Sequence, residues 1–181
     1  NKYEQPPANA LQVLFIGNSH LYVNNIPRQV QEIAAHSPGA KPVFSEDALY
    51  PGVTLAWHTR NDLTVDLLSR KWDAVVIQER SLEAFDDPRG WRAGTEGIRD
   101  MAKAGGTERF IYIETWARHN QDVNYKTLPD RVGENYAQQQ AMLARVIAEH
   151  TDALKLEKAP VGTAGMSRQF WMEPGCTPLA L

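Results

Sequence analysis

The residues best suited to chemistry in this 181-residue chain come directly after short apolar runs. Gly17, Asn18 and Ser19 follow the run LQVLFIG, Gly52 follows a second run, and Gln78 closes the run AVVIQ. A serine on a sharp strand-to-helix turn can present its hydroxyl beside backbone N–H groups, which suits a nucleophile next to an oxyanion site. Glycine, asparagine and serine are also common turn and helix-cap residues, so the spacing alone leaves a simple turn open.

Five apolar runs predict the strands that would position these residues. They are Leu11–Gly17 and residues 42–49, 72–78, 109–117 and 158–162. Helices are predicted over residues 24–36, 54–69 and 130–150, and a further helix follows the loop at residues 86–88 and ends near Ala104. Strands that alternate with helices imply crossover connections and hence a parallel sheet covered on both faces. The sequence therefore predicts an α/β fold, a three-layer α/β/α sandwich with a flavodoxin-like parallel sheet of about five strands. Ligands of such sheets bind beyond the carboxyl ends of the strands.

Length and composition favour one domain over residues 1–181, with residues 1–10 as a polar arm. Nineteen basic and 22 acidic residues give a net charge of -3, which disfavours nucleic acid and a polybasic membrane surface as partners. No apolar run is long enough for a membrane span. The single cysteine, Cys176, excludes a multi-cysteine metal site, and no common metal-binding or phosphate-binding motif occurs. The chain begins at Asn1, so both a cytoplasmic and a secreted or periplasmic location stay open.

Five segments resemble the conserved blocks of the SGNH (GDSL-type) hydrolases, in their expected order. VLFIGNSHLYVNNIP resembles the first block in the branch where GNS replaces GDS, PGVTLAWH the second, and KWDAVVIQERS the third. IYIETWARHN and APVGTA resemble the segments after strands four and five. The resemblance covers approximately residues 11–163. It implies a serine hydrolase that needs no metal and no cofactor.

The resemblance assigns roles to three of the residues at the strand ends. Ser19 is expected to be the nucleophile, and its own backbone N–H one oxyanion donor. Gly52 is expected to supply a second backbone donor. The more typical third block of the family carries an asparagine amide in the oxyanion hole, but no GxND string occurs here. Gln78 stands in that place, and its amide can donate the same kind of hydrogen bond.

The catalytic base is harder to assign, because five histidines compete. His119 follows the fourth predicted strand at the ligand-facing edge and is the best stand-in, although an exposed loop histidine is the alternative. His58 is expected to be a structural hydrogen-bonding residue on a helix. His20 adjoins the candidate nucleophile, but neighbouring side chains at a helix start diverge. His36 and His150 are expected near helix ends, where the helix dipole favours an imidazolium.

The family's usual base lies in a D-x-x-H block near the carboxyl end, and this sequence shows no such block. No histidine follows His150, Asp152 is the last aspartate, and residues 164–181 resemble nothing in the family. We therefore expect the chain to lack the usual base, through truncation, an altered reading frame or genuine loss, and to catalyse weakly. A missing final helix would also bare an apolar strip of the sheet, which predicts a homodimer.

The leading interpretation is a serine esterase that cleaves short acyl esters, such as acetyl groups on carbohydrate, through an acyl-enzyme. A non-catalytic ligand-binding domain that has lost its base is the alternative, and a phosphate or nucleotide binder is a more distant third. Trp72 is expected in the core, whereas Trp116 could line a pocket and stack on a sugar. A glycosidase built on Glu79, Glu114 and Asp122 is disfavoured, because no spacing fixes two of them opposite each other.

Overall fold

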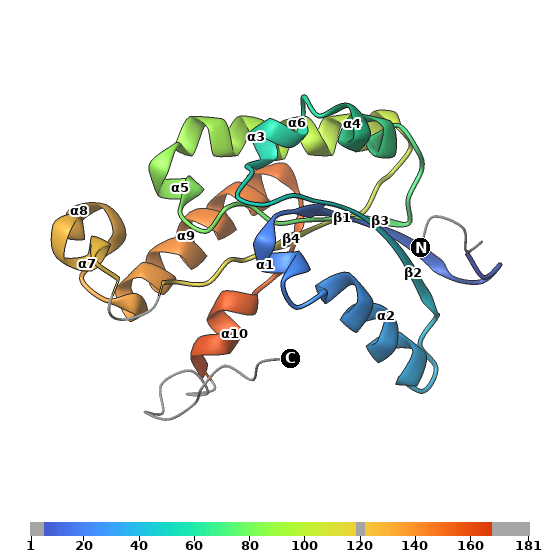
Figure 1. Ribbon diagram of the computed structural model, residues 1–181, viewed down its shortest axis with the longest axis horizontal. Helices are drawn as coiled ribbons and strands as arrows, with labels where there is room; N and C mark the ends of the chain where they lie inside the picture. Colours follow the sequence, from blue (N-terminus) through green and yellow to red (C-terminus); the bar gives the residue numbers. More distant parts are fainter. Residues whose placement is uncertain (1–5, 119–121, 168–181) are drawn as a thin grey trace.

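A five-stranded sheet organises the computed structural model, which describes residues 6–118 and 122–167. The strands are β1 (Leu11–Gly17), β2 (Val43–Leu49), β3 (Ala74–Ile77), β4 (Phe110–Ile113) and β5 (Glu157–Ala159). They lie in the order β2-β1-β3-β4-β5, and each neighbouring pair is parallel. The sequence-based prediction of a parallel α/β sheet is confirmed. The labelled strands β1 to β4 run toward the left-hand side of Figure 1, and β5, which is parallel to β4, ends at the same edge of the sheet.

Helices cover both faces of the sheet. Above it in Figure 1 lie α3 (Leu55–His58), α4 (Asp62–Leu68), α5 (Glu83–Asp86) and α6 (Pro88–Ala104), and below it lie α1 (Ser19–Tyr22), α2 (Ile26–His36) and α10 (Val161–Ser167). The remaining helices are α7 (Asn124–Thr127), α8 (Pro129–Val132) and α9 (Tyr136–Leu154).

Two apolar clusters, one on each face of the sheet, hold the layers together. The larger includes Leu55 of α3, Trp91 of α6 and Leu143 of α9, and the smaller includes Phe15 of β1 and Leu21 of α1. The full set of fully buried large side chains also contains Leu14, Ile16, Leu68, Ile77, Ile98, Tyr112 and Ile147. Trp72 belongs to the larger cluster, as expected. The three-layer arrangement follows because both faces of the central strands are apolar.

Three predicted elements differ from the structure at their boundaries. The helix expected over residues 54–69 is two helices, because the side chain of Asn61 accepts a hydrogen bond from the backbone N–H of Thr64 (3.0 Å) and starts α4 anew. The strand expected over residues 109–117 ends at Ile113. The fifth strand ends at Ala159, where Pro160 precedes the start of α10.

The long helix α9, which was predicted over residues 130–150, also starts later than predicted. Its start at Tyr136 is fixed by Asn135, whose side chain accepts from the N–H of Gln138 at 3.0 Å. Gly133, at φ 84°, separates it from α8. Within the described residues, no helix combines the length and apolar character that crossing a membrane requires.

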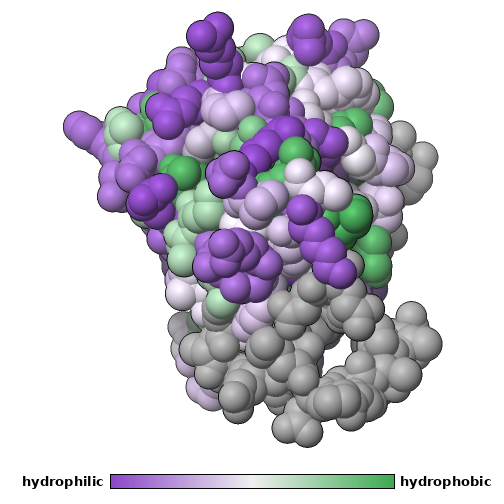
Figure 2. Space-filling model, turned by 90° about the vertical axis from the view of Figure 1, so that its left-hand side faces the viewer, coloured by the Kyte–Doolittle hydropathy of each residue, from purple (hydrophilic) through white to green (hydrophobic). Residues whose placement is uncertain are grey.

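The end of the molecule at which the strands finish is mixed in character. Figure 2 shows the molecule from that side, where hydrophilic side chains are interspersed with smaller hydrophobic groups. Because parallel strands all end here, the loops that carry Ser19, Gly52 and Gln78 belong to this one edge.

Candidate active site

Ser19 lies at the turn from β1 into α1, where the sequence places it. Asn18 has extended backbone angles and caps the helix, and Ser19 is its first residue. A side chain at Gly17 would come within 2.9 Å of Gln78 Oε1, so glycine allows the two strand ends to approach. Ser19 is half-buried, and neither its hydroxyl nor its backbone N–H hydrogen-bonds to another described residue. Both groups are thus available to a ligand.

Gln78 is fully buried at the end of β3 and joins that strand to β1. Its Oε1 accepts a hydrogen bond from the backbone N–H of Asn18 at 3.3 Å, and its Nε2 donates to the carbonyl of Glu79. A primary amide has two N–H protons, and the second proton of Gln78 Nε2 bonds to no other described residue. The role of Gln78 as an oxyanion donor remains a prediction.

Gly52 lies in the exposed loop that follows β2. Its φ of 66° lies in the left-handed region, which glycine adopts most readily. Lack of space is not the reason for the glycine, because a Cβ there would meet no atom within 4 Å. Two hydrogen bonds hold this loop against β1. Tyr50 N–H donates to the Gly17 carbonyl (3.3 Å), and Asn18 Nδ2 donates to the Val53 carbonyl (3.2 Å). Within the described residues, the N–H of Gly52 forms no hydrogen bond.

His58 is a structural residue, as expected from its place on a helix. The ring is fully buried, with Nε2 2.9 Å from the Gly17 carbonyl and Nδ1 3.0 Å from Thr64 Oγ1. The carbonyl can only accept, so Nε2 carries a proton. Burial lowers the pKa of His58, which favours the neutral ring, and Nδ1 then accepts from the Thr64 hydroxyl. Neither ring nitrogen is left to act as a base.

His20 is the histidine that lies nearest to Ser19 in the chain, and its ring faces the loop after β4. Its Nδ1 is 2.9 Å from Asn18 Oδ1, so Nδ1 carries the proton and Nε2 the lone pair. The ring meets Trp116 edge to face, with the two centroids 4.8 Å apart. Burial, and secondly the charge of Arg118, lower the pKa of His20 and favour a neutral imidazole.

The other histidines are less suited to the site. His119, the predicted stand-in base, lies outside the described residues. His36 ends α2 and is exposed, with Nδ1 2.8 Å from the Glu32 carbonyl. We predicted His150 near a helix end, but the residue lies inside α9. Its ring centroid is 4.7 Å from that of Trp91. Burial there lowers its pKa, so the expected stabilised imidazolium is wrong.

The three acids considered for a glycosidase are engaged in structural contacts. Both carboxylate oxygens of Glu79 lie near the backbone N–H of Leu55, and Oε1 also accepts from the Arg80 N–H. Burial is the main cause that raises the pKa of Glu79 to about 8. Glu114 is fully buried and ties the start of α10 to β4 through the N–H of Thr163 at 2.6 Å. Asp122 pairs with Arg118 at 3.3 Å.

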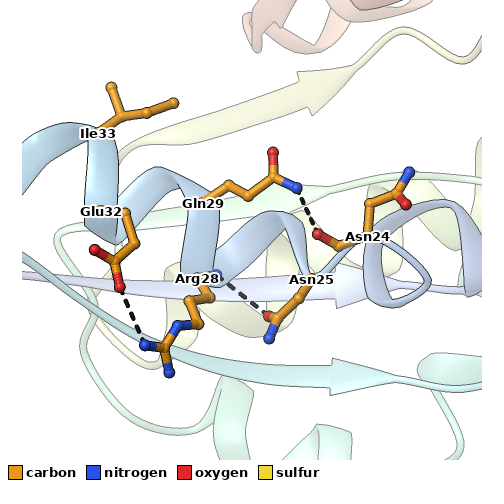
Figure 3. Close-up of a pocket in the computed structure, with 6 residues that line it drawn as sticks. All are labelled: Asn24, Asn25, Arg28, Gln29, Glu32 and Ile33. Atoms are coloured by element: carbon orange, nitrogen blue, oxygen red, sulfur yellow. Dashed lines mark hydrogen bonds and ion pairs between the residues drawn. The ribbon is translucent and has the colours of Figure 1, made fainter. Parts of the chain in front are cut away.

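A shallow hollow lies nearby, but the predicted site residues do not line it. Figure 3 shows its lining along the start of α2, where Arg28 pairs with Glu32 at 3.2 Å and Gln29 donates to the Asn24 carbonyl. Asn25 and Ile33 complete the lining. All of these side chains are exposed, so the hollow is a surface groove. In residues 6–118 and 122–167, no cluster of three histidine, cysteine or acidic side chains could hold a metal ion.

Asn18 was named in the sequence analysis as part of the turn after the first strand, but it was given no role of its own. It is almost fully buried and contacts the loop after β2, the end of β3 and His20. An amide between a strand-closing glycine and the serine was the available signal, because asparagine is a favoured helix cap. Its donor to Val53 could not be predicted without the position of the neighbouring loop.

Several solved structures resemble this fold. A protein from Slackia heliotrinireducens described as a candidate SGNH hydrolase matches with a TM-score of 0.71 and 23% identity, covering 88% of this chain and 83% of that one. A DUF4886 family protein from Bacteroides uniformis matches with a TM-score of 0.65 and 16% identity, covering 87% and 70%. The protein TesA matches with a TM-score of 0.56 and 16% identity, covering 82% and 77%.

These similarities show the fold. No protein-family model matches the sequence, and no curated protein sequence matches it either.

Proposed function

We propose that this protein is a serine esterase of the SGNH type and that Ser19 is its nucleophile. One observation carries the proposal. The hydroxyl and backbone N–H of Ser19 are unengaged by other described residues, at a strand end that two hydrogen bonds hold beside the Gly52 loop. A nucleophile needs such a free hydroxyl, and an oxyanion needs preorganised N–H donors that no other group uses. The solved structures with this fold include one protein described as a candidate SGNH hydrolase, which supports the same class of reaction.

In the proposed reaction, Ser19 Oγ attacks the ester carbonyl carbon while a base takes the hydroxyl proton. The carbonyl oxygen becomes an oxyanion, with the N–H groups of Ser19 and Gly52 and the free amide proton of Gln78 as its donors. The ester C–O bond then breaks, and the alcohol leaves with the proton from the base. Water releases the acyl group from Ser19 in the reverse sequence and regenerates the hydroxyl.

The base in this proposal is His119, with His20 as the alternative. His58 is excluded because both of its ring nitrogens are engaged. His20 keeps an unprotonated Nε2, and its lowered pKa makes it neutral near pH 7. Its side chain leaves the helix in a different direction from that of Ser19, which disfavours a direct transfer. Separate alanine substitutions at positions 119 and 20 distinguish them, because only loss of the true base abolishes turnover.

The proposed substrates are esters of short acyl groups, including acetyl groups on carbohydrate. Trp116 supports a ring-shaped alcohol, because its indole is 41% exposed and lies beside His20, the neighbour of the nucleophile. Aromatic side chains left open at a site of this kind offer a flat apolar surface on which a ring can stack. Support for short acyl groups comes from the tight turn between β1 and α1, because one residue between these elements leaves no room for an inserted lid.

Covalent labelling tests the nucleophile directly. The intact protein is treated with a fluorophosphonate, which reacts with activated serines, and the modified peptide is located by mass spectrometry. We expect one adduct on Ser19, absent from Ser19→Ala and retained in Ser37→Ala, a control at the far end of α2 whose hydroxyl bonds only the backbone. An adduct on another serine would move the nucleophile elsewhere, and no adduct would favour a non-catalytic ligand-binding domain.

A further inference from the structure

We propose that Asn18 is a positioning residue of this site, and that it works through both ends of its side-chain amide in a way that aspartate could not reproduce. The proposal rests on the serine-esterase function proposed above and adds a residue to it. Asn18 touches no substrate in this scheme. It acts on the Gly52 loop and on His20.

The contacts of Asn18 join three segments at the carboxyl edge of the sheet. Its Nδ2 donates to the carbonyl of Val53 (3.2 Å), the residue after Gly52. Its Oδ1 accepts from the backbone N–H of His20 (3.3 Å) and lies 2.9 Å from His20 Nδ1. Its own N–H donates to Gln78 Oε1 at 3.3 Å. One residue therefore links the loop after β2, the start of α1 and the end of β3.

The partners themselves fix the orientation of the amide. The Val53 carbonyl has only lone pairs to offer, and the His20 backbone N–H has only a proton. The amide nitrogen must therefore face Val53, and the amide oxygen must face His20. The same oxygen requires a proton on His20 Nδ1, which selects the tautomer with a lone pair on Nε2.

A carboxylate at this position would fail at both ends. It has no donor for the Val53 carbonyl, and two acceptors would then face each other at a side chain that is 1% exposed. At the other end, a negative charge beside His20 Nδ1 would favour the imidazolium. The asparagine adds no charge beside His20, whose pKa is lowered by burial and by Arg118, and it holds the Gly52 loop against the nucleophile turn. The GNS sequence, with asparagine before the serine, has its structural reason in the carbonyl of Val53.

Within the part of the chain that the structure describes, four ionisable side chains surround this junction. His20 lies on α1 and His58 on α3, with His58 bonded to the Gly17 carbonyl. Glu79 follows β3 and binds the N–H of Leu55, and Arg118 lies on the loop after β4. The titration of His58, Glu79 and Arg118 is common to the parent protein and its variants, so a difference in pH profile between them reports position 18 and its effect on His20.

The test compares Asn18→Asp with Asn25→Asp in hydrolysis of p-nitrophenyl acetate from pH 5 to pH 9. Asn25 is a matched control, because it is also a helix cap, is exposed, and uses its side chain only as an acceptor from the Arg28 N–H. Burial at this position raises the pKa of a carboxyl, so we expect the loss of kcat in Asn18→Asp to shrink towards pH 5 as the carboxyl takes up a proton and can donate to Val53. At pH 8 its kcat should be about 10- to 100-fold lower with little change in KM, a smaller loss than that of a direct oxyanion donor. Asn25→Asp should match the parent throughout.

A second readout does not depend on activity. Nitrogen and proton NMR of the histidine rings in the parent protein should show His20 as the Nδ1–H tautomer, and Asn18→Asp should raise its pKa. An Nε2–H tautomer in the parent would overturn the proposal even if the variant did not fold. So would a variant whose pH profile and His20 pKa equal those of the parent. If the parent has no Ser19-dependent turnover, the esterase proposal fails, and the NMR result still decides the role of Asn18.

Discussion

At the residue scale, Gln78 has one observed contact and one proposed role, and a pair of variants separates the two. Its Oε1 holds the Asn18 N–H, and its free amide proton is the proposed oxyanion donor. Gln78→Glu keeps the acceptor and removes the donor, whereas Gln78→Ala removes both. We expect either variant to lower kcat by about 10²- to 10³-fold with a smaller change in KM, the usual effect of losing one oxyanion donor.

Ester turnover and thermal unfolding, measured together, separate chemistry from stability. Gln78→Ala should also lower the melting temperature, since it leaves the Asn18 N–H unsatisfied in a buried place. Parent turnover in Gln78→Glu would place the donor on another group.

Glu79 gives the protein a pH dependence of stability with a defined sign. Burial raises its pKa to about 8 in the folded state, from 4.5. Between these values the folded state binds more protons than the unfolded state, so the free energy of unfolding falls as pH rises, by at most about 1.4 kcal/mol per pH unit. Glu79→Gln should remove this slope.

Comparison of the parent with Glu79→Gln between pH 6.5 and pH 8 separates Glu79 from the buried histidines. Burial lowers the pKa values of His20, His58 and His150, so these residues cost stability as pH falls through about 6.5, and they do so equally in the parent and in the variant. Urea unfolding at several pH values in this window measures the slope. Glu46→Gln, which changes an exposed partner of Arg70, is the control and should leave it unchanged. An equal slope in the parent and Glu79→Gln would contradict the assignment.

At the scale of elements, we expect the loop after β4 to decide which alcohols the proposed site accepts. β4 ends at Ile113, and Trp116 follows on a loop tied to α9 through the hydrogen bond from the Ala117 N–H to Gln140 (2.7 Å). We expect Trp116→Ala to lower kcat/KM for phenyl acetate and acetylated xylose by about 10-fold, since one stacked ring is worth about 0.5–1.5 kcal/mol. Ethyl acetate, which has no ring, should be hydrolysed at the parent rate.

Trp57→Ala provides the matched comparison for this prediction. Trp57, a residue of α3, is exposed to a similar extent, at 37%. Its ring packs against the rings of Tyr50 and His58. It should not discriminate between ring and ethyl esters. Equal losses on both kinds of ester in Trp116→Ala would mean that the indole only supports the loop.

The elements also show what local pattern could and could not predict. The β1 strand was predicted at its observed bounds, because an apolar run that ends in a glycine leaves little choice. The break at Asn61 was missed, since asparagine is tolerated inside helices and only its hydrogen bond to Thr64 makes it a cap. The strand after Arg109 was predicted too long because IETWA is rich in strand formers. Its last residues instead bind α9 and α10 through Gln140 and Glu114.

The site itself was predictable only in its backbone positions. Parallel strands bring their carboxyl ends to one edge, so Ser19, Gly52 and Gln78 could be placed together from their order in the chain. The hydrogen-bond partners were not predictable, because each joins residues distant in sequence. His58 contacts the carbonyl of Gly17, and Asn18 contacts that of Val53.

At the scale of the whole molecule, the packing of the sheet determines where the proposed active-site groups lie. The apolar clusters on the two faces fix the sheet, and the sheet fixes the edge at which the free hydroxyl and N–H groups lie. A homodimer stays a prediction from the sequence, and sedimentation velocity of the intact chain would decide it.

Turnover of p-nitrophenyl acetate by the purified protein and by Ser19→Ala tests the central claim most directly. Ser19 carries the nucleophilic oxygen at the end of the first strand, and its hydroxyl bonds to no other described residue, so its removal should change stability little. We predict measurable hydrolysis by the parent, loss to the uncatalysed background in Ser19→Ala, and equal melting temperatures for the two. Hydrolysis that persists in a folded Ser19→Ala protein, or a parent no faster than that variant, would contradict the account.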